Sequence, residues 1–462
     1  MPRSPLRPSA AIALAVLAAS AATAVACRGT LSRAPEPVIH VERLPVDTIR
    51  HDTVAGDTAF PMMPAPAPAR TVSSAPIRVL VAGAASSAEI VATGRWTAIG
   101  RDGSSLAAGA DDAHWVVSMR GGRVRLANID DGRASSLESP LTIRALDARS
   151  RVIANGKAYR GELLVVASGD ELVVVNRLPI EEYLRGVVPL EIGERQAGER
   201  AAVEAQAIAA RSYAYTHLAP SRRFDVRATV DDQVYGGAGA ERPVSDAAVA
   251  ATAGQVLRYA GRIADTPYHS TCGGMTAEPG EVWTGEAGAP YLRRVDDHIP
   301  GSRRAYCDIS PRYDWVREMS GDAIGAAVTR YLKSRGATRA IGTARALRIE
   351  SRTPSGRVGS LAIEGSEGET TLRGNAIRYA LRAAGGELLN STYFSIESSG
   401  SSVGAGGGGE RGGRRRFTLR GHGYGHGIGM CQWGAIGRAR AGQDAVTILQ
   451  TYYPGTSVGI VQ

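Results

Sequence analysis

Glu191 is the residue whose chemistry most needs explaining, because it is a single carboxylate in the apolar run Arg185–Gly193, RGVVPLEIG. Water solvates a surface Glu at little cost, whereas an apolar setting penalises the charged form and raises the pKa. Such a carboxyl is either a paired structural group or an acid held protonated for proton transfer. The sequence offers Arg185 and Arg195 as ion-pair partners for the structural alternative.

A second chemical feature is the segment Gly421–Gly427, GHGYGHG, in which glycine alternates with His422, Tyr424 and His426 directly after a predicted strand. Glycine lets the backbone approach another group closely. The segment therefore predicts either a binding site lined by two imidazoles and a phenol, or a packed strand edge where glycines relieve crowding. The G-x-G-x-G spacing is not a dinucleotide-binding fingerprint.

Cys272, Cys307 and Cys431 could form a disulfide, remain reduced or bind a metal. Cys272 and Cys307 are separated by few helical signals, and we predict a disulfide between them, with Cys431 buried and reduced near the site. Another pairing, or a zinc ion held by all three with His269, is the alternative. Because no C-x-x-C or H-E-x-x-H spacing occurs, we predict no cofactor and keep zinc only as that alternative.

The elements that must position these residues follow from periodicity. Short strands punctuated by glycine are predicted from residue 77 to residue 176, and an alanine-rich helix free of Gly and Pro over 199–218. We expect further helices over 321–336 and 375–386, and a strand pair around a Pro-Ser-Gly turn in 346–365. The Gly/Arg-rich stretch 398–416 is predicted to be a low-complexity loop between two strands.

These expectations define an α+β fold: a single large β-rich unit with a few helices over residues 77–462. Within it, 77–165 is the β-rich N-terminal part and 166–462 is the core that carries Glu191. Residues 27–76 are rich in Pro, Ala and Ser, and are predicted to be a disordered tether.

The N-terminus predicts export. Residues 1–26 combine a basic start, an apolar run and small residues at the cut, as in a signal peptide. The end, AVAC, resembles a lipobox, so we predict lipidation of Cys27 and a membrane-anchored lipoprotein of the cell envelope or periplasm; ordinary cleavage after the A-x-A site is the alternative. The net charge of +9 favours an anionic partner, but no basic helix with interleaved aromatics supports nucleic acid.

From about residue 77 to the C-terminus, the chain resembles the stage II sporulation protein D family (SpoIID/LytB). The resemblance rests on blocks in the family's order: YRGELLVV, LPIEEYLRGVVPLEI, AVEAQAIAARSYA, DDQVYGG, PYHSTCGGMT with VW and PYL, SGRV with LRGNAIRYAL and LLNSTYFSI, GHGYGHGIGMCQWGA and ILQTYYPGT. Some members bind zinc through Cys and His around the D-x-Q-V-Y block. This sequence has no Cys there, so that metal is not carried over.

The resemblance implies a lytic transglycosylase that cleaves peptidoglycan glycan strands between N-acetylmuramic acid (MurNAc) and N-acetylglucosamine (GlcNAc), preferring strands stripped of peptides. Glu191 falls on the family's catalytic position. One acid suffices, because Glu191 would protonate the glycosidic oxygen and then deprotonate the MurNAc C6 hydroxyl, which closes a 1,6-anhydro ring. Other members are amidase enhancers, so a non-catalytic wall-binding partner of a cell-wall amidase is the alternative.

The family resemblance also suggests which residues bind substrate. Arg211 would hold either a muramyl lactyl carboxylate or a structural acid, and Gln206 and Tyr213 share one face of the predicted helix. The two histidines and the tyrosine of the glycine-rich segment would donate to sugar hydroxyls. The expected substrate-binding residues are Gln206, Arg211, Tyr213, His422, Tyr424, His426 and Gln432.

Overall fold

The computed structural model describes residues 76–108, 113–283, 285, 287–383, 385–399 and 415–461. The predicted signal peptide, Cys27 and nearly all of the predicted tether lie outside the described residues, as does most of the predicted loop 398–416. Within the described ranges, no helix combines the length and apolar character needed to cross a membrane.

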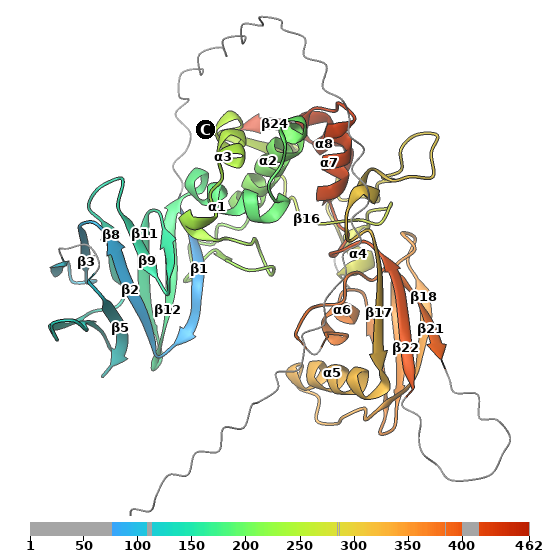
Figure 1. The fold of residues 1–462 in the computed structure, drawn as a ribbon, viewed down its shortest axis with the longest axis horizontal. Helices are drawn as coiled ribbons and strands as arrows, with labels where there is room; N and C mark the ends of the chain where they lie inside the picture. Colours follow the sequence, from blue (N-terminus) through green and yellow to red (C-terminus); the bar gives the residue numbers. More distant parts are fainter. Residues whose placement is uncertain are drawn as a thin grey trace, which may run out of the picture. The chain divides into compact units, whose positions relative to one another are not determined.

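The β-rich N-terminal part forms two sheets with the orders β13-β1-β12-β11-β8-β3-β4 and β10-β9-β2-β5-β6-β7 (Figure 1). All the predicted strands of this part are present. Their inward side chains, among them Trp96, Trp115 and Leu126, belong to one hydrophobic core. The strands are β1 Pro76–Ala85, β2 Ser87–Thr93, β3 Trp96–Ile99, β4 Ser105–Ala108, β5 Trp115–Arg120, β6 Arg123–Asn128, β7 Ala134–Leu137, β8 Leu141–Ala145, β9 Arg151–Ala154, β10 Lys157–Tyr159, β11 Glu162–Ser168, β12 Glu171–Pro179 and β13 Val226–Arg227.

A group of helices continues the same core. The last long strand, β12, leads directly into α1 (Ile180–Ile192), and α1 packs against α2 (Arg200–Thr216). The alanine-rich α2 confirms the helix predicted over 199–218, and it also contacts α3 (Pro243–Ala251), α7 (Gln432–Arg440) and α8 (Ala445–Tyr452). Small alanine side chains let several helices approach α2, which is why residues from all parts of the chain meet around it.

The helix α1 was not predicted. Its second half contains Gly186, Val187, Val188 and Pro189, which are poor helix formers. Burial outweighs this low propensity, because Tyr183, Val187 and other α1 side chains are inaccessible to solvent in the core. The chain leaves α1 at Gly193, which has a positive φ of 76°.

Residues 314–422 contain a second hydrophobic core, which includes Trp315, Ile324 and Phe417. Strands β17 (Asp314–Ser320), β22 (Arg416–His422) and β21 (Phe394–Ser399) form one antiparallel sheet, and β18 (Ala344–Arg352), β19 (Val358–Gly365) and β20 (Glu369–Arg373) form another. The β18–β19 pair confirms the strand pair predicted around the Pro-Ser-Gly turn.

Two helices belong to this second core. α5 (Gly321–Ser334) confirms the helix predicted over 321–336, and it begins where the Ser320 side chain accepts a hydrogen bond from the Ala323 N–H at 3.2 Å. α6 (Ala376–Ala380) is shorter than the predicted helix over 375–386. The chain turns back after α6 because the buried Arg378 side chain donates to the Leu389 carbonyl at 2.9 Å.

Short elements connect the two cores. β16 (Tyr268–His269) pairs in parallel with β23 (Met430–Cys431), so segments about 160 residues apart run side by side. The remaining elements are α4 Pro279–Val282, β14 Gln255–Tyr259, β15 Arg262–Ile263, β24 Ser457–Ile460 and the short 3-10 helices η1 Ala197–Glu199, η2 Gly237–Ala240 and η3 Tyr306–Ile309. The structure confirms the α+β class with a strand-rich composition.

Candidate functional site

The Glu191 carboxyl lies in the last turn of α1, where three segments distant in sequence meet. Its Oε1 accepts a hydrogen bond from the Val234 N–H at 2.7 Å, and its Oε2 accepts one from Gln432 Nε2 at 3.4 Å. Val234 belongs to the loop after β13, and Gln432 is the first residue of α7. The residue is partly exposed, and protein surrounds its carboxyl.

Burial raises the pKa of Glu191 to about 7, and the hydrogen bonds from Val234 and Gln432 oppose this rise. No ion pair joins Glu191 to another residue within the described ranges. Arg185 instead pairs with Glu241 at 3.0 Å and Asp246 at 2.5 Å. Both protonation states of this carboxyl are therefore accessible near neutral pH.

Arg195 also contacts groups other than Glu191. Its Nε donates to the Ile192 carbonyl at 2.7 Å, and its guanidinium lies over the Trp433 ring at 4.9 Å from the ring centroid. The ion-pair alternative for Glu191 therefore does not hold with either arginine in this structure.

Two amides form a chain behind the carboxyl. Gln432 Nε2, which faces Glu191, also lies 3.3 Å from Gln206 Oε1. Gln206 is fully buried on α2, and its own Nε2 has no hydrogen-bond partner in the part of the chain that is described. The structure thus brings both predicted glutamines to Glu191, Gln432 by direct contact and Gln206 through Gln432.

The charge of Glu191 influences three tyrosines. The Glu191 charge adds to the burial that raises the pKa of Tyr183, Tyr213 and Tyr268. Tyr183 donates to Gln233 Oε1 at 3.1 Å, and Gln233 Nε2 donates to Tyr268 Oη at 2.9 Å. Apart from Tyr213, these residues were not singled out from the sequence, although Gln233 and Val234 stand in the DDQVYGG block and Tyr268 in PYHSTCGG, and those blocks were the available signal.

Tyr213 and Arg211 occupy different environments on α2. Tyr213 Oη donates to Asp232 Oδ1 at 3.3 Å, and its ring stacks on His217 at 3.7 Å between centroids. Arg211 is fully buried and makes a two-pronged ion pair with Glu181 at 2.7 and 2.8 Å. Further donors of Arg211 reach the backbone of α3 and β14, so the guanidinium holds a structural acid and does not face a substrate.

The glycine-rich segment is a packed strand edge. Gly425 and Gly429 have φ values of 116° and 69°, which favour glycine. A Cβ on Gly429 would lie 2.0 Å from the Pro267 carbonyl oxygen, and one on Gly425 would lie 2.8 Å from the His269 Cβ. The glycines therefore allow close approach to residues 267–272 of the same protein, which supports the crowding-relief alternative over close approach to a ligand.

His426 does not present a free imidazole. Hydrogen bonding assigns its Nε2–H as donor to the Tyr268 carbonyl at 2.8 Å, and its Nδ1 accepts from the Ile428 N–H at 3.1 Å. Burial lowers the pKa of His426 to about 3, so the ring is neutral. The prediction that His426 donates to sugar hydroxyls is wrong in this structure, because both ring nitrogens bond the backbone; the ring instead supports Tyr268.

His422 and Tyr424 lie farther along the same segment. His422 is exposed and pairs through Nδ1 with Asp314 at 2.5 Å. The Arg312 guanidinium lies 4.3 Å from the centroid of the Tyr424 ring, and the Tyr424 backbone pairs with Thr271. Both side chains remain accessible to a ligand, but their partners differ from those of Glu191.

The cysteines come together in a way that only partly matches the prediction. Cys272 and Cys307 are neighbours, with 3.4 Å between their Sγ atoms, but both are free thiols and Cys431 joins them. The residue that completes the group is Asp297. His269 instead bonds the Ile428 carbonyl through Nδ1 at 3.1 Å. No sequence pattern pointed to Asp297, because its spacing from the cysteines is irregular.

Two protein-family models match parts of this chain. A family model described as stage II sporulation protein (SpoIID) matches residues 168–259, which include Glu191, Gln206 and Val234. A second model, for a domain of unknown function (DUF8618), matches residues 304–429. Gln432 lies outside both matched ranges, so the contact between Gln432 and Glu191 is visible only in the folded chain.

Similar proteins come from several bacteria. An uncharacterized protein of Brachyspira hyodysenteriae is 29% identical over 307 residues, which are 66% of this chain and 73% of that protein. The amidase enhancer of Bacillus subtilis is 26% identical over 392 residues, and stage II sporulation protein D of the same organism is 27% identical over 302 residues. These matches cover 76% and 62% of this chain, 50% of the enhancer and 75% of the sporulation protein.

Proposed function

Because the chain belongs to the stage II sporulation protein D family, we propose that it is a cell-wall lytic transglycosylase. Its substrate is the glycan strand of peptidoglycan, cut between MurNAc and GlcNAc with formation of 1,6-anhydro-MurNAc. The observation that carries the proposal is Glu191: a carboxyl on a partly exposed residue, without an ion-pair partner in the described residues, whose pKa burial raises to about 7.

A pKa near the working pH suits a group that must both give and take a proton. In the first step protonated Glu191 transfers its proton to the glycosidic oxygen as the bond from MurNAc C1 to that oxygen breaks. In the second step the carboxylate takes the proton of the MurNAc C6 hydroxyl, whose oxygen then bonds to C1. The carboxyl returns to its protonated form, and no water is consumed.

The two carboxyl oxygens have different partners, which assigns them different tasks. Oε1 is held at 2.7 Å by the Val234 N–H, a donor that favours an unprotonated oxygen. Oε2 has the longer contact, 3.4 Å to Gln432, and is the oxygen that carries the proton. Val234 therefore orients the carboxyl, and Gln432 stabilises the carboxylate form in the second step.

Substitution of Glu191 tests the proposal. Glu191→Gln is nearly isosteric and removes only the proton donor, so the yield of 1,6-anhydro-MurNAc ends from peptide-free glycan strands should fall about 100- to 10,000-fold. Mass spectrometry of the released fragments measures this yield, and intact peptidoglycan shows whether peptides must be removed first. Glu182→Gln, on the same helix, is the matched control and should retain activity. Anhydro product at the wild-type rate from Glu191→Gln would reject Glu191 as the acid.

A second candidate function is stimulation of a cell-wall amidase. It is favoured by the similarity to the Bacillus subtilis amidase enhancer, which covers 76% of this chain but only half of the enhancer. A non-catalytic enhancer would raise the release of stem peptides by a purified N-acetylmuramoyl-L-alanine amidase, and Glu191→Gln would do so equally well. Anhydro ends formed by the protein alone are expected only from the transglycosylase.

Location at the membrane is part of the proposed function. A diacylated Cys27 would anchor the protein to the cell envelope, because two acyl chains suffice for stable binding. Cys27→Ser should then move the protein from the membrane fraction to the soluble fraction. Equal membrane association of the variant would contradict the anchor without bearing on Glu191.

A further inference from the structure

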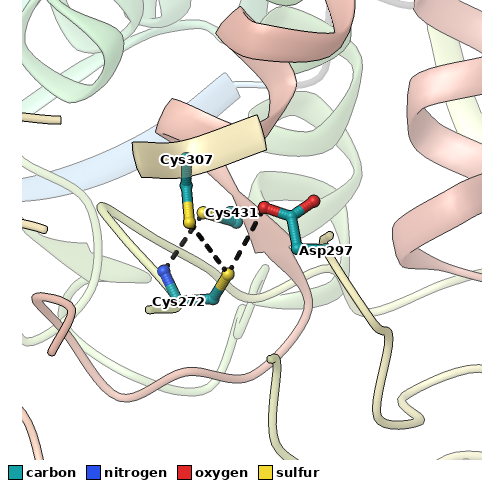
Figure 2. Close-up of side chains that lie close together, drawn as sticks. All are labelled: Cys272, Asp297, Cys307 and Cys431. Carbon is teal, nitrogen blue, oxygen red and sulfur yellow. Dashed lines mark hydrogen bonds between the residues drawn. The ribbon is translucent and has the colours of Figure 1, made fainter. Parts of the chain in front are cut away.

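Four ligand-type side chains meet in the core (Figure 2). Cys272 follows β16, Asp297 and Cys307 come from the next connecting segment, and Cys431 ends β23. All four are buried, and their ligand atoms lie within 4.8 Å of one another. Cys272 Sγ is 3.4 Å from Cys307 Sγ and 3.4 Å from Asp297 Oδ2.

These separations suit a small tetrahedral ion. Zinc binds thiolate sulfur at about 2.3 Å and carboxylate oxygen at about 2.0 to 2.2 Å, which places neighbouring ligands of a tetrahedron about 3.5 to 3.8 Å apart. The two contacts of Cys272, both 3.4 Å, are just shorter than that range, and the ligand atoms of the whole group lie within 4.8 Å, so modest adjustments would let them surround one ion. Soft thiolate ligands also favour zinc over hard cations such as magnesium or calcium.

Backbone donors contact the sulfur of Cys431. Cys431 Sγ accepts from the Cys272 N–H at 3.1 Å and from the Gly434 N–H at 3.3 Å. Such donors stabilise the thiolate form, which is the form that binds a metal.

Asp297 is oriented by its neighbours so that one oxygen remains for an ion. Its Oδ1 accepts from Arg438 Nη2 at 3.0 Å and from Tyr452 Oη at 2.7 Å. Its Oδ2 faces the sulfur of Cys272. A carboxylate held by outer partners and turned toward thiolates is the usual arrangement of a metal ligand with its supporting shell.

A disulfide explains this environment less well. A bond between Cys272 and Cys307 would remove the thiol that faces Asp297 Oδ2, and would leave that oxygen and the Cys431 thiol buried side by side. Buried polar and charged groups are costly unless they are paired. A divalent cation would instead pair with all four groups at once.

We propose that Cys272, Asp297, Cys307 and Cys431 bind one zinc ion in a closed, structural site. With four protein ligands the ion has no open position for substrate or water, so its role is to tie three distant segments together. Cys431 directly precedes Gln432, which contacts Glu191. The ion would therefore hold the start of α7 beside the carboxyl without taking part in proton transfer.

Metal content of the purified full chain tests this inference. Protein prepared without reductant, equilibrated with zinc ion and passed through a desalting column should contain one zinc per chain by elemental analysis. Alkylation and peptide mapping should find the three cysteines protected until a chelator is added. A chain that takes up no zinc and yields a mapped Cys272–Cys307 disulfide would overturn the proposal.

Variants identify the ligands. The double variant Cys272→Ser/Cys307→Ser should lose the zinc, and retention of one zinc per chain by that variant would reject the site. His269→Gln is the matched control, because His269 is a buried neighbour outside the ligand group, and it should keep the zinc. Arg438→Met should weaken zinc binding by about 10- to 100-fold through loss of the Asp297 support.

A spectroscopic readout does not depend on the stability of the variants. Cobalt(II) bound in place of zinc in the wild-type chain should show sulfur-to-metal charge transfer and the strong visible bands of a tetrahedral thiolate site. Weak octahedral bands would overturn the proposal. Glu191→Gln should bind zinc like the wild type, so failure of the metal site and failure of the proposed transglycosylase are separate results.

Discussion

Two carboxyls in this protein share a raised pKa but have different surroundings. Burial raises the pKa of both Glu191 and Asp297 to about 7. Glu191 is partly exposed and receives two hydrogen bonds from neutral donors, whereas Asp297 is inaccessible to solvent and pairs with the cation Arg438. A raised pKa therefore does not by itself identify a proton donor; the two residues differ in solvent exposure and in whether a charged side chain contacts the carboxyl.

The two carboxyls also differ in the number of side chains that each one contacts. The Glu191 carboxyl has only two hydrogen bonds, both from neutral donors, that a change of its protonation state could affect. Asp297 is connected to Tyr452, Arg438 and the cysteines, so any change of its charge disturbs several buried groups. We expect the same chemical change to affect activity at one site and stability at the other.

The largest expected effect comes from converting each acid to its amide. Glu191→Gln should reduce formation of anhydro product about 100- to 10,000-fold while the folded state persists. Asp297→Asn should lower the free energy of unfolding by about 3 to 5 kcal/mol, because it leaves the buried Arg438 without its anion. Turnover on glycan strands and urea unfolding of both variants measure the contrast.

The comparison would fail if the two amide variants behaved alike. Unfolding of Glu191→Gln at neutral pH would show that Glu191 is a structural group. Wild-type stability of Asp297→Asn would show that the Asp297 charge is not needed to balance Arg438.

An intermediate effect is expected in the pH dependence of stability. The pKa of Glu191 is raised from 4.5 in the unfolded chain to about 7 in the folded chain, so the folded state binds the proton more tightly. This contribution to stability is fully present below pH 4.5 and is lost as the pH rises to about 7. Glu191→Gln lacks it, so the stability of the variant relative to wild type should increase by up to about 3 kcal/mol across that window.

Urea midpoints of wild type and Glu191→Gln between pH 4 and pH 8 test this dependence. Asp297 titrates in both proteins, so its contribution cancels in the difference. A constant difference across the range would mean that the folded protein does not raise the pKa of Glu191. In the wild type, transglycosylase activity should fall above about pH 7, as the proton donor is lost.

The smallest expected effect concerns Gln432. Gln432→Ala removes the donor to Glu191 Oε2, which raises the pKa of Glu191 further and moves the alkaline limb of the pH–rate profile upward. The rate should fall several-fold, since a single neutral hydrogen bond contributes about 1 kcal/mol. Gln450→Ala, an exposed amide on α8, is the control, and both variants should keep their zinc. An unmoved profile in Gln432→Ala would show that Gln432 does not tune the acid.

Much of the architecture could be predicted because it depends on local patterns. Alternation of apolar side chains predicted the strands of the N-terminal part, and alanine content predicted α2. α5 was also predicted from its local sequence pattern. Glu191 was identified from the sequence by the contrast between one carboxylate and its apolar neighbours, together with the family blocks.

Long-range contacts decided what local patterns could not. α1 is helical although Val187, Val188 and Pro189 disfavour helix, because packing in the core outweighs propensity. His426 looked like a ligand-binding imidazole in the sequence, but the backbone of Tyr268 and Ile428 occupies both ring nitrogens.

Long-range contacts also decide the roles of the charged side chains and of the cysteines. The sequence alone left Arg211 between a substrate and a structural acid, and only the fold places it against Glu181. Nothing in the sequence joined Asp297 to the cysteines, because their proximity depends on the parallel pairing of β16 with β23 and on the position of η3. A residue's type sets what chemistry it can perform, whereas its partners, often more than 100 residues away, set its charge state and whether it is free to act.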